Sequence, residues 1–142
     1  MKLQQISVFL ENKPGRLMEA CAALSDAGVN VETMSLVEAG EFGVLRVLVK
    51  DSDAAFEALK GRFTAKKTSA LAVQIPDEAG ALTKLLGLFA ENDGLNVEYM
   101  YGFTSKKLGV AAIVLAMNDV DRALKVLQAA NVALVGADEL FA

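Results

Sequence analysis

The chain has 142 residues, 54% hydrophobic and 23% charged, with a mean hydropathy of +0.37, which suits one domain or two small ones and excludes a disordered protein. It contains no histidine and one cysteine, which excludes histidine-based triads, internal disulfides and cysteine metal clusters. The net charge of -4 argues against direct nucleic-acid binding. No apolar run approaches the roughly 20 residues of a membrane-spanning helix, so we expect a cytoplasmic protein that binds no membrane.

The first 28 residues predict a strand followed by a helix. Ile6, Val8 and Leu10 alternate with polar or smaller residues, which is typical of a half-buried strand. Apolar residues then recur at i, i+3, i+4 and i+7 between Leu17 and Leu24, which indicates an amphipathic helix. A glycine that suits a left-handed C-terminal cap follows at position 28.

The next forty residues predict a hairpin, a second helix and a closing strand. Two β-rich runs, residues 29–37 and 42–50, are joined by a turn at residues 38–41. Asp53 lies where a helix N-cap is expected, and a short strand follows near residues 63–68.

The second half of the chain repeats this order. Eight residues recur after 66 positions: Gly28, Asn30, Val31, Glu32, Met34, Gly43, Val44 and Asp53 match Gly94, Asn96, Val97, Glu98, Met100, Gly109, Val110 and Asp119. Gly15 and Leu17 match Gly80 and Leu82 after 65 positions, so we expect one residue inserted within the first helix of the second copy.

The second copy therefore predicts the same elements. They are a strand through Leu71, Val73 and Ile75, a helix from Leu82 to Phe89 ending near Gly94, strands at 95–103 and 108–117 with a turn at 104–107, an N-cap at Asp119, and a strand near 132–140.

The order β-α-β-β-α-β, twice, predicts an α+β fold of two ferredoxin-like units, 1–68 and 69–142, with antiparallel sheets and both helices on one face. Their edge strands need covering, so we also expect a homodimer.

The loop between the first strand and helix is a candidate ligand site. Pro14 is preorganised for the turn, Gly15 lets a ligand approach closely, and free N–H groups at the helix start suit a carboxylate. The second copy places Asp77 where Asn12 would be, and an acid there suits an ammonium. The alternative is that both loops are ordinary helix-start turns.

Two asparagines follow the glycines at the ends of the first helices. Asn30 and Asn96 can donate and accept hydrogen bonds to a ligand, or they can be turn asparagines. Asn30 and the Asn12 loop lie at opposite ends of one helix, so a ligand that contacts both needs two units. Cys21 lies on an apolar helix face and the aspartate pairs fit helix caps, so we predict no catalytic residue, metal site or cofactor.

Several of these segments resemble the ACT-domain pattern. Residues 12–17, Asn-Lys-Pro-Gly-Arg-Leu, and 28–31, Gly-Val-Asn-Val, are similar to the Pro-Gly turn and Gly-x-Asn of these small-molecule-binding regulatory modules. Two such units cover the chain. Residues 61–73 with 99–101, Tyr-Met-Tyr, further resemble small bacterial proteins made only of two tandem ACT domains.

The resemblance implies a ligand site between ACT domains. In ACT regulators, amino acids bind against the loop of one domain and the residue after the helix of its neighbour. The implied site residues are Asn12, Lys13, Pro14, Gly15, Arg16, Leu17 and Asn30 in the first unit and Asp77, Gly80 and Asn96 in the second. Ala79-Gly80 replaces the usual Pro-Gly, which leaves open whether both units bind.

The resemblance therefore implies a non-catalytic regulatory module that binds a free amino acid and acts on an enzyme or another regulator. The ligand's carboxylate would lie on backbone N–H groups, and its ammonium on asparagine or aspartate oxygens. The alternative is a regulatory subunit that pairs with an enzyme through its sheet and binds no ligand. An enzyme on this scaffold is the least favoured interpretation, because the sequence shows no nucleophile with a base.

Overall fold

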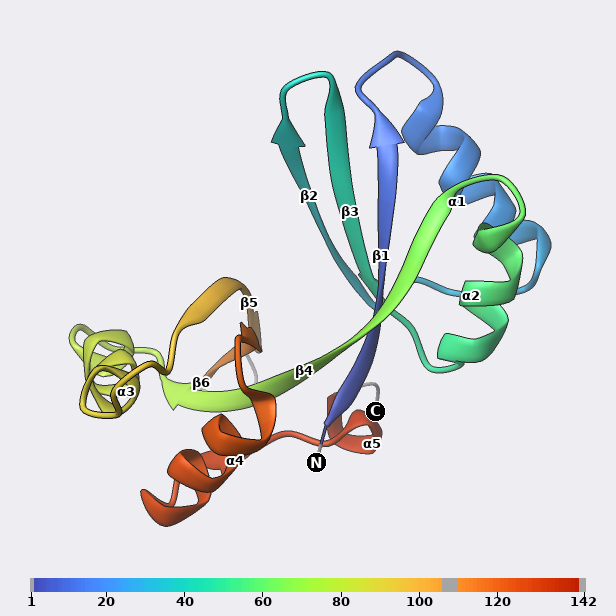
Figure 1. Ribbon diagram of the computed structural model, residues 1–142. Helices are drawn as coiled ribbons and strands as arrows, with labels where there is room; N and C mark the ends of the chain where they lie inside the picture. The colour runs from blue at the N-terminus through green and yellow to red at the C-terminus, as the bar shows by residue number, and fades with distance from the viewer. Residues whose placement is uncertain (1, 106–109, 141–142) are drawn as a thin grey trace. The chain divides into compact units, whose positions relative to one another are not determined.

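The computed structural model describes residues 2–105 and 110–140, which form two units (Figure 1). The first unit is Gln4–Thr68, and the second is Ser69–Leu140 together with residues 2 and 3. One strand, β4 (Thr64–Pro76), supplies its first residues to the first unit and the remainder to the second.

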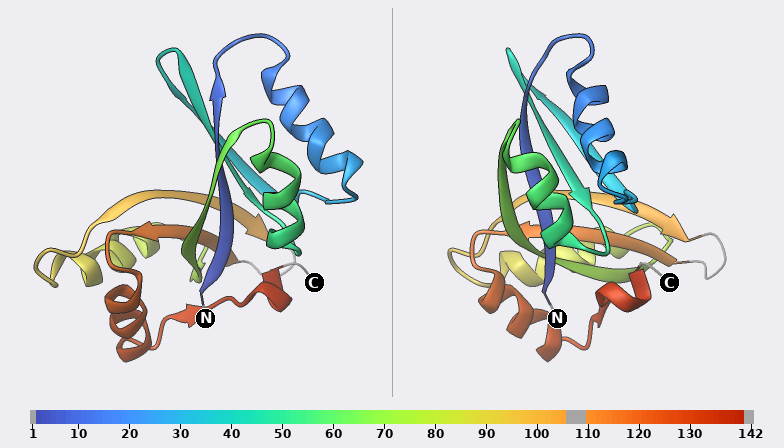
Figure 2. Two further views of the ribbon diagram at one scale, coloured as in Figure 1. Left: turned by 45° about the vertical axis from the view of Figure 1, so that its right-hand side comes forward. Right: turned by 90° about the vertical axis from the view of Figure 1, so that its right-hand side faces the viewer.

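The first unit follows the predicted order of elements. They are β1 (Leu3–Glu11), α1 (Arg16–Asp26), β2 (Thr33–Ala39), β3 (Phe42–Leu48) and α2 (Ser52–Lys60), followed by the start of β4. The strand order is β2-β3-β1-β4, and β1 and β2 both pair antiparallel with β3. Helices α1 and α2 lie on the same face of this sheet, as the right-hand view of Figure 2 shows.

The core of the first unit lies between the sheet and these helices. Alternate residues of β1 and β3 are buried there, and α1 covers them with Ala20 and Leu24. The buried strand residues are Ile6, Val8, Leu10, Leu45 and Val47. The period-two alternation therefore identified the inner face of β1 correctly.

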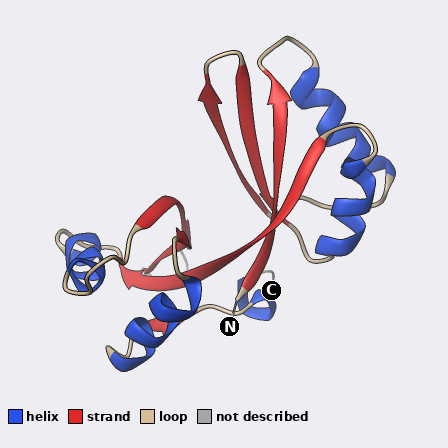
Figure 3. Ribbon diagram, viewed as in Figure 1, coloured by secondary structure: helices blue, strands red, loops and turns tan. Residues whose placement is uncertain are grey.

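The second unit repeats the architecture. After β4 come α3 (Ala81–Ala90), β5 (Val97–Ser105), β6 (Val110–Met117), α4 (Val120–Ala129), β7 (Ala133–Leu134) and α5 (Ala137–Leu140). The strand order is β7-β4-β6-β5, with every pair antiparallel, and α3 and α4 pack on one face (Figure 3). The predicted α+β fold of two ferredoxin-like units is confirmed.

One predicted helix cap is wrong. Asp51, and not Asp53, caps α2, since its side chain accepts a hydrogen bond from the Ala54 N–H at 3.0 Å. Asp53 lies within the first turn of α2, where a negative charge is still favoured by the helix dipole. In the second unit Asp119 caps α4 as predicted, with its side chain accepting from the Arg122 N–H at 3.1 Å.

The extra residue of the second copy lies after α3 and not within it, which corrects the prediction. The apolar stripe of α3 keeps the displacement of 65 as far as Phe89, and α3 ends at Ala90. Gly94 adopts the left-handed conformation (φ 77°), but four residues beyond the helix, so it is not the C-terminal cap that was predicted. Gly28 (φ 73°) does follow α1 directly, after Ala27.

The predicted closing strand of the second copy is also largely wrong. Only Ala133–Leu134 is a strand, and the chain then forms the short helix α5. Asp138 and Glu139 lie in the first turn of α5, where the helix dipole favours acidic residues that strands disfavour. Of the two predicted turns, the first is present at Gly40 and Glu41, and the one at 104–107 lies partly outside the described residues.

Candidate functional site

The loop from β1 to α1 ends in a glycine with a left-handed backbone. Gly15 has φ 89° and precedes the first residue of α1, and Gly80 has φ 88° at the same place before α3. The replacement of Pro14 by Ala79 therefore leaves the loop glycine in the same conformation. Because glycine has no side chain to cap a helix, the N–H groups of Leu17 and Met18 in the first turn of α1 remain donors for a ligand.

Ion pairs hold the loop of the first unit. Glu11 accepts hydrogen bonds from Lys13 Nζ at 2.7 Å and from Arg16 Nη2 at 2.6 Å, and Arg16 Nη1 donates to Glu19 at 2.8 Å. These contacts lower the pKa of Glu11 to about 2, through the Lys13 hydrogen bond first and the Arg16 hydrogen bond second. The positive charges of Lys13 and Arg16 are thus balanced by carboxylates of the same unit.

This arrangement predicts an unusually acidic carboxyl group. A carbon-13 NMR titration should place the Glu11 midpoint near 2, and Lys13→Ala should raise it toward 4.5. Because the folded pKa is depressed, the stabilisation is present above pH 4.5 and is lost as the pH falls through 2. Lys60→Ala, which breaks the separate Lys60–Glu57 pair, should leave that midpoint unchanged. A wild-type midpoint near 4.5 would show that the pairs do not persist in solution.

Asn12 ties the loop to the β2–β3 turn. Its backbone N–H donates to the Glu41 carbonyl at 2.8 Å, and its side-chain Nδ2 donates to the Gly40 carbonyl at 3.3 Å. These two bonds bring the loop beside strand β2, at the edge of the sheet. Since Nδ2 is a donor here, the Oδ1 of Asn12 remains an acceptor.

A cavity of about 240 Å³ lies at this junction. Its walls come from the end of β1, the loop, the first turn of α1 and two strands of the hairpin. The lining residues are Leu10, Glu11, Asn12, Lys13, Leu17, Leu36, Val37, Glu38 and Gly43. The structure thus brings Asn12, Lys13 and Leu17 of the predicted set to one cavity, with Pro14, Gly15 and Arg16 in the same loop and helix start.

Asn30 lies beside a different cavity of the first unit. That cavity, also about 240 Å³, is lined by Gly28, Asn30, Lys50 and Asp51 among others, and Asn30 Nδ2 donates to Glu32 Oε1 at 3.4 Å. Asn12 and Asn30 therefore do not meet within the first unit.

Asn118 contacts the backbone of the predicted site residue Asn96, and the sequence analysis did not single it out. Its Oδ1 accepts from the Asn96 N–H at 2.8 Å, and its Nδ2 donates to the Gly94 carbonyl at 2.7 Å, so it fixes the backbone around Asn96. The repeat gave no signal, because Ser52 stands at the corresponding place in the first copy. The side chains of Asp77 and Asn96 are exposed.

Comparison with known proteins identifies the family. A family model described as the ACT domain pair matches residues 1–142. The chain belongs to the ACT domain pair family. A solved protein from Bacteroides thetaiotaomicron is 36% identical, with a TM-score of 0.90 over 99% of this chain and 96% of that one. A search of the curated proteins finds no match.

Two further solved structures share the ACT fold. The regulatory subunits of aspartate kinase from Thermus thermophilus and Thermus flavus are 19% and 20% identical to this chain, each with a TM-score of 0.62. The alignments cover 89% and 90% of this chain and 91% and 92% of theirs. Both are similar to this ACT pair along nearly their whole length.

Two features are absent from residues 2–105 and 110–140, a metal-binding cluster and a helix that could span a membrane. No group of three His, Cys, Asp or Glu side chains there could hold a metal ion. None of the described helices combines the length and apolar character that a membrane crossing requires.

Proposed function

We propose that this ACT pair is a non-catalytic regulatory module that binds a free amino acid at the loop of its first ACT unit. The observation that carries the proposal is the cavity of about 240 Å³ where Asn12 and Leu17 face strand β2, next to an uncapped helix start. A cavity of this size, below the range of drug-sized sites, suits a small metabolite.

Each end of an amino acid has a partner there. The N–H groups of Leu17 and Met18 lie in the first turn of α1, after a glycine that cannot cap them, and they would bind the carboxylate. The Oδ1 of Asn12 and the carboxylate of Glu38 would bind the ammonium. In the second ACT unit the same roles would fall to the Gly80 loop and Asp77, while Asn96, at the other end of α3, would serve a neighbouring unit as Asn30 does.

A neighbouring ACT unit would complete the site. Asn12 and Asn30 line separate cavities, so one ligand meets both only when Asn30 comes from another unit, as in a homodimer. Ligand binding would then favour one pairing of ACT units over another, which is how the module would signal to a regulated enzyme.

Thermal unfolding of the purified protein against each of the 20 amino acids tests this proposal. A ligand at 100 times its Kd should stabilise the fold by about 2.7 kcal/mol, a shift of several degrees. We expect the shift for one amino acid or a few related ones, and its loss in Asn12→Ala. Asn92→Ala, in the turn after α3, is the matched control and should keep the response. If every amino acid leaves the transition in place, the proposal fails.

One observation favours the alternative of a ligand-free interaction module. Phe9 and Val37 both lie opposite Val44 in the strand register, on the sheet face away from the helices, and Phe42 shares that face. These apolar side chains are 46%, 49% and 53% exposed for Phe9, Val37 and Phe42. Grouped exposed apolar residues are typical of protein-interaction surfaces. Co-purification of an enzyme that Phe9→Ser releases, without any amino-acid response, would support this alternative.

A further inference from the structure

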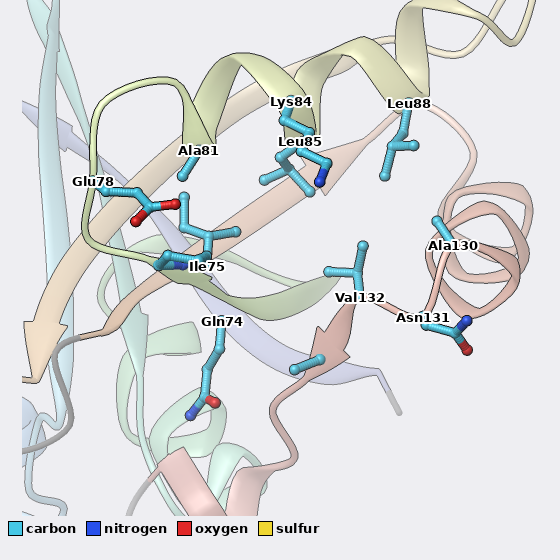
Figure 4. Close-up of a pocket in the computed structure, with 12 residues that line it drawn as sticks. Gln74, Ile75, Glu78, Ala81, Lys84, Leu85, Leu88, Ala130, Asn131 and Val132 are labelled. Atoms are coloured by element: carbon cyan, nitrogen blue, oxygen red, sulfur yellow. The ribbon is translucent and has the colours of Figure 1, made fainter.

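A third cavity, of about 410 Å³, lies within the second ACT unit between α3 and β7. The strand wall of this cavity is β4 with β7, whereas the Asn12 cavity of the first unit is walled by the β2–β3 hairpin. The two cavities therefore lie on opposite sides of the loop that precedes the first helix of each unit. Figure 4 shows Leu85 and Leu88 reaching from α3 toward Ile75 and Val132 on the strand side. The lining is mostly apolar, as expected of a small-molecule pocket.

The cavity arises from a difference between the two copies. Helix α4 continues to Ala129, whereas α2 ends at Lys60, which corresponds to Val126 in the repeat. Strand β7 consequently begins only at Ala133 and pairs with Val73 and Gln74, so it does not reach the end of β4. The residues after α4 and the start of β7 thus line the cavity together with one stripe of α3.

Two opposite charges stand at this cavity, and neither has a side-chain partner among the described residues. Glu78 comes from the loop before α3, and Lys84 from the stripe of α3 that lines the cavity with Ala81 and Leu85 (Figure 4), and both charged residues are exposed. The corresponding residues of the first unit, Lys13 and Glu19, are both ion-paired.

The repeat shows why these charges lost their partners. In the first unit Lys13 pairs with Glu11, and Glu19 pairs with Arg16. In the second unit Pro76 stands in place of Glu11 and Ala81 in place of Arg16. Glu78 stands in place of Lys13 and Lys84 in place of Glu19, so the charge at each of these two positions has the opposite sign. The changes remove two long charged side chains, add apolar lining and leave one carboxylate and one ammonium free.

We propose that this cavity is a separate site for a free amino acid with an apolar side chain. The side chain would fill the space between Leu85, Leu88 and Val132. The ligand's ammonium would pair with Glu78 and its carboxylate with Lys84. A simple fatty acid or amine would pair with only one of these two charges, whereas a free amino acid pairs with both. The site uses no residue of the first ACT unit and stands independently of the function proposed above.

Isothermal titration calorimetry on the full chain tests this site with leucine, isoleucine, valine, methionine and phenylalanine. We expect saturable binding of at least one, weakened about tenfold or more in Glu78→Gln and in Lys84→Gln, because each change removes a charge-assisted hydrogen bond. Ala81→Leu, which fills the cavity and keeps both charges, should weaken binding as well. Glu91→Gln and Lys125→Gln are the matched controls outside the cavity and should bind as the wild type does.

Analogues of the ligand test the two charges separately. If leucine is the ligand, 4-methylpentanoate lacks the ammonium and 3-methylbutylamine lacks the carboxylate, and both should bind about tenfold more weakly or worse. Asn12→Ala should leave this binding intact, which separates it from binding at the first ACT unit. The proposal is overturned if none of the five amino acids binds Asn12→Ala below about 10 mM, or if adding Glu78→Gln or Lys84→Gln to Asn12→Ala leaves the binding as tight.

Discussion

Replacement of Leu24 by alanine should destabilise the protein by about 2–5 kcal/mol. Leu24 is 1% exposed and packs from α1 onto the inner faces of β1 and β3. The substitution removes buried methyl groups and leaves a cavity that the surrounding sheet and helix fill only in part. Urea unfolding followed by circular dichroism measures the change as a lowered transition midpoint.

Met18→Ala, on the same helix, is the matched control. Met18 is 67% exposed, so its truncation should change the free energy of unfolding by about 0.5 kcal/mol or less. Equal effects of the two substitutions would show that α1 does not pack through Leu24 as the structure has it.

Gly15→Ala should destabilise the protein by about 1–2 kcal/mol, while Gly87→Ala should stabilise it by about 0.5–1 kcal/mol. Both glycines have open space for a methyl group, since a Cβ added at either position would meet no atom within 4 Å beyond the adjoining chain. They differ in backbone: Gly15 has φ 89°, which L-residues rarely adopt, whereas Gly87 lies in the interior of α3, where alanine is favoured.

The opposite signs of these two substitutions are the decisive feature. The same chemical change is made at two open positions, so packing cannot account for the difference. Urea unfolding of both variants measures it directly. If Gly15→Ala were neutral or stabilising, residue 15 would not adopt the left-handed backbone conformation in solution. The helix start at the proposed site would then differ from the one in the structure.

The inner strands and the first helices could be predicted from the sequence because burial on one face imposes a period. Ile6, Val8 and Leu10 in β1 and the stripe from Leu17 to Leu24 in α1 show this clearly. The start of strand β2 was harder to predict, because the strand begins at Thr33, four residues later than expected. Val29 and Val31 before it alternate with polar residues as in a strand, but the Val29 N–H is bonded to the Leu24 carbonyl of α1 and not to a strand.

Local signals were weaker where two residues compete for one role. Asp51 and Asp53 both suit a helix start, and the sequence does not show which of them reaches the free N–H group. The region 132–140 contains Val132 and Leu134, which favour a strand, but the extension of α4 and the acidic residues of α5 decide the outcome. These are tertiary effects that local periodicity does not register.

The candidate site was predictable in its loops but not in its walls. The spacing between the first strand and the first helix predicts that Asn12 and Gly15 lie in the loop that joins them. Leu36 and Glu38 line the cavity only because the hairpin register brings β2 alongside a loop more than twenty residues earlier in the chain. The cavity beside Lys84 was missed for a related reason, since it depends on where α4 stops.

The most direct test of the proposed amino-acid site is a methyl NMR titration of the intact protein with the amino acid whose thermal shift is lost in Asn12→Ala. We expect the signals of Leu17, Leu36 and Val37, around the first-unit cavity, to change saturably, and Asn12→Ala to weaken this response about tenfold or more. If those three residues keep their signals while the amino acid binds elsewhere or not at all, the proposed site in the first ACT unit is contradicted.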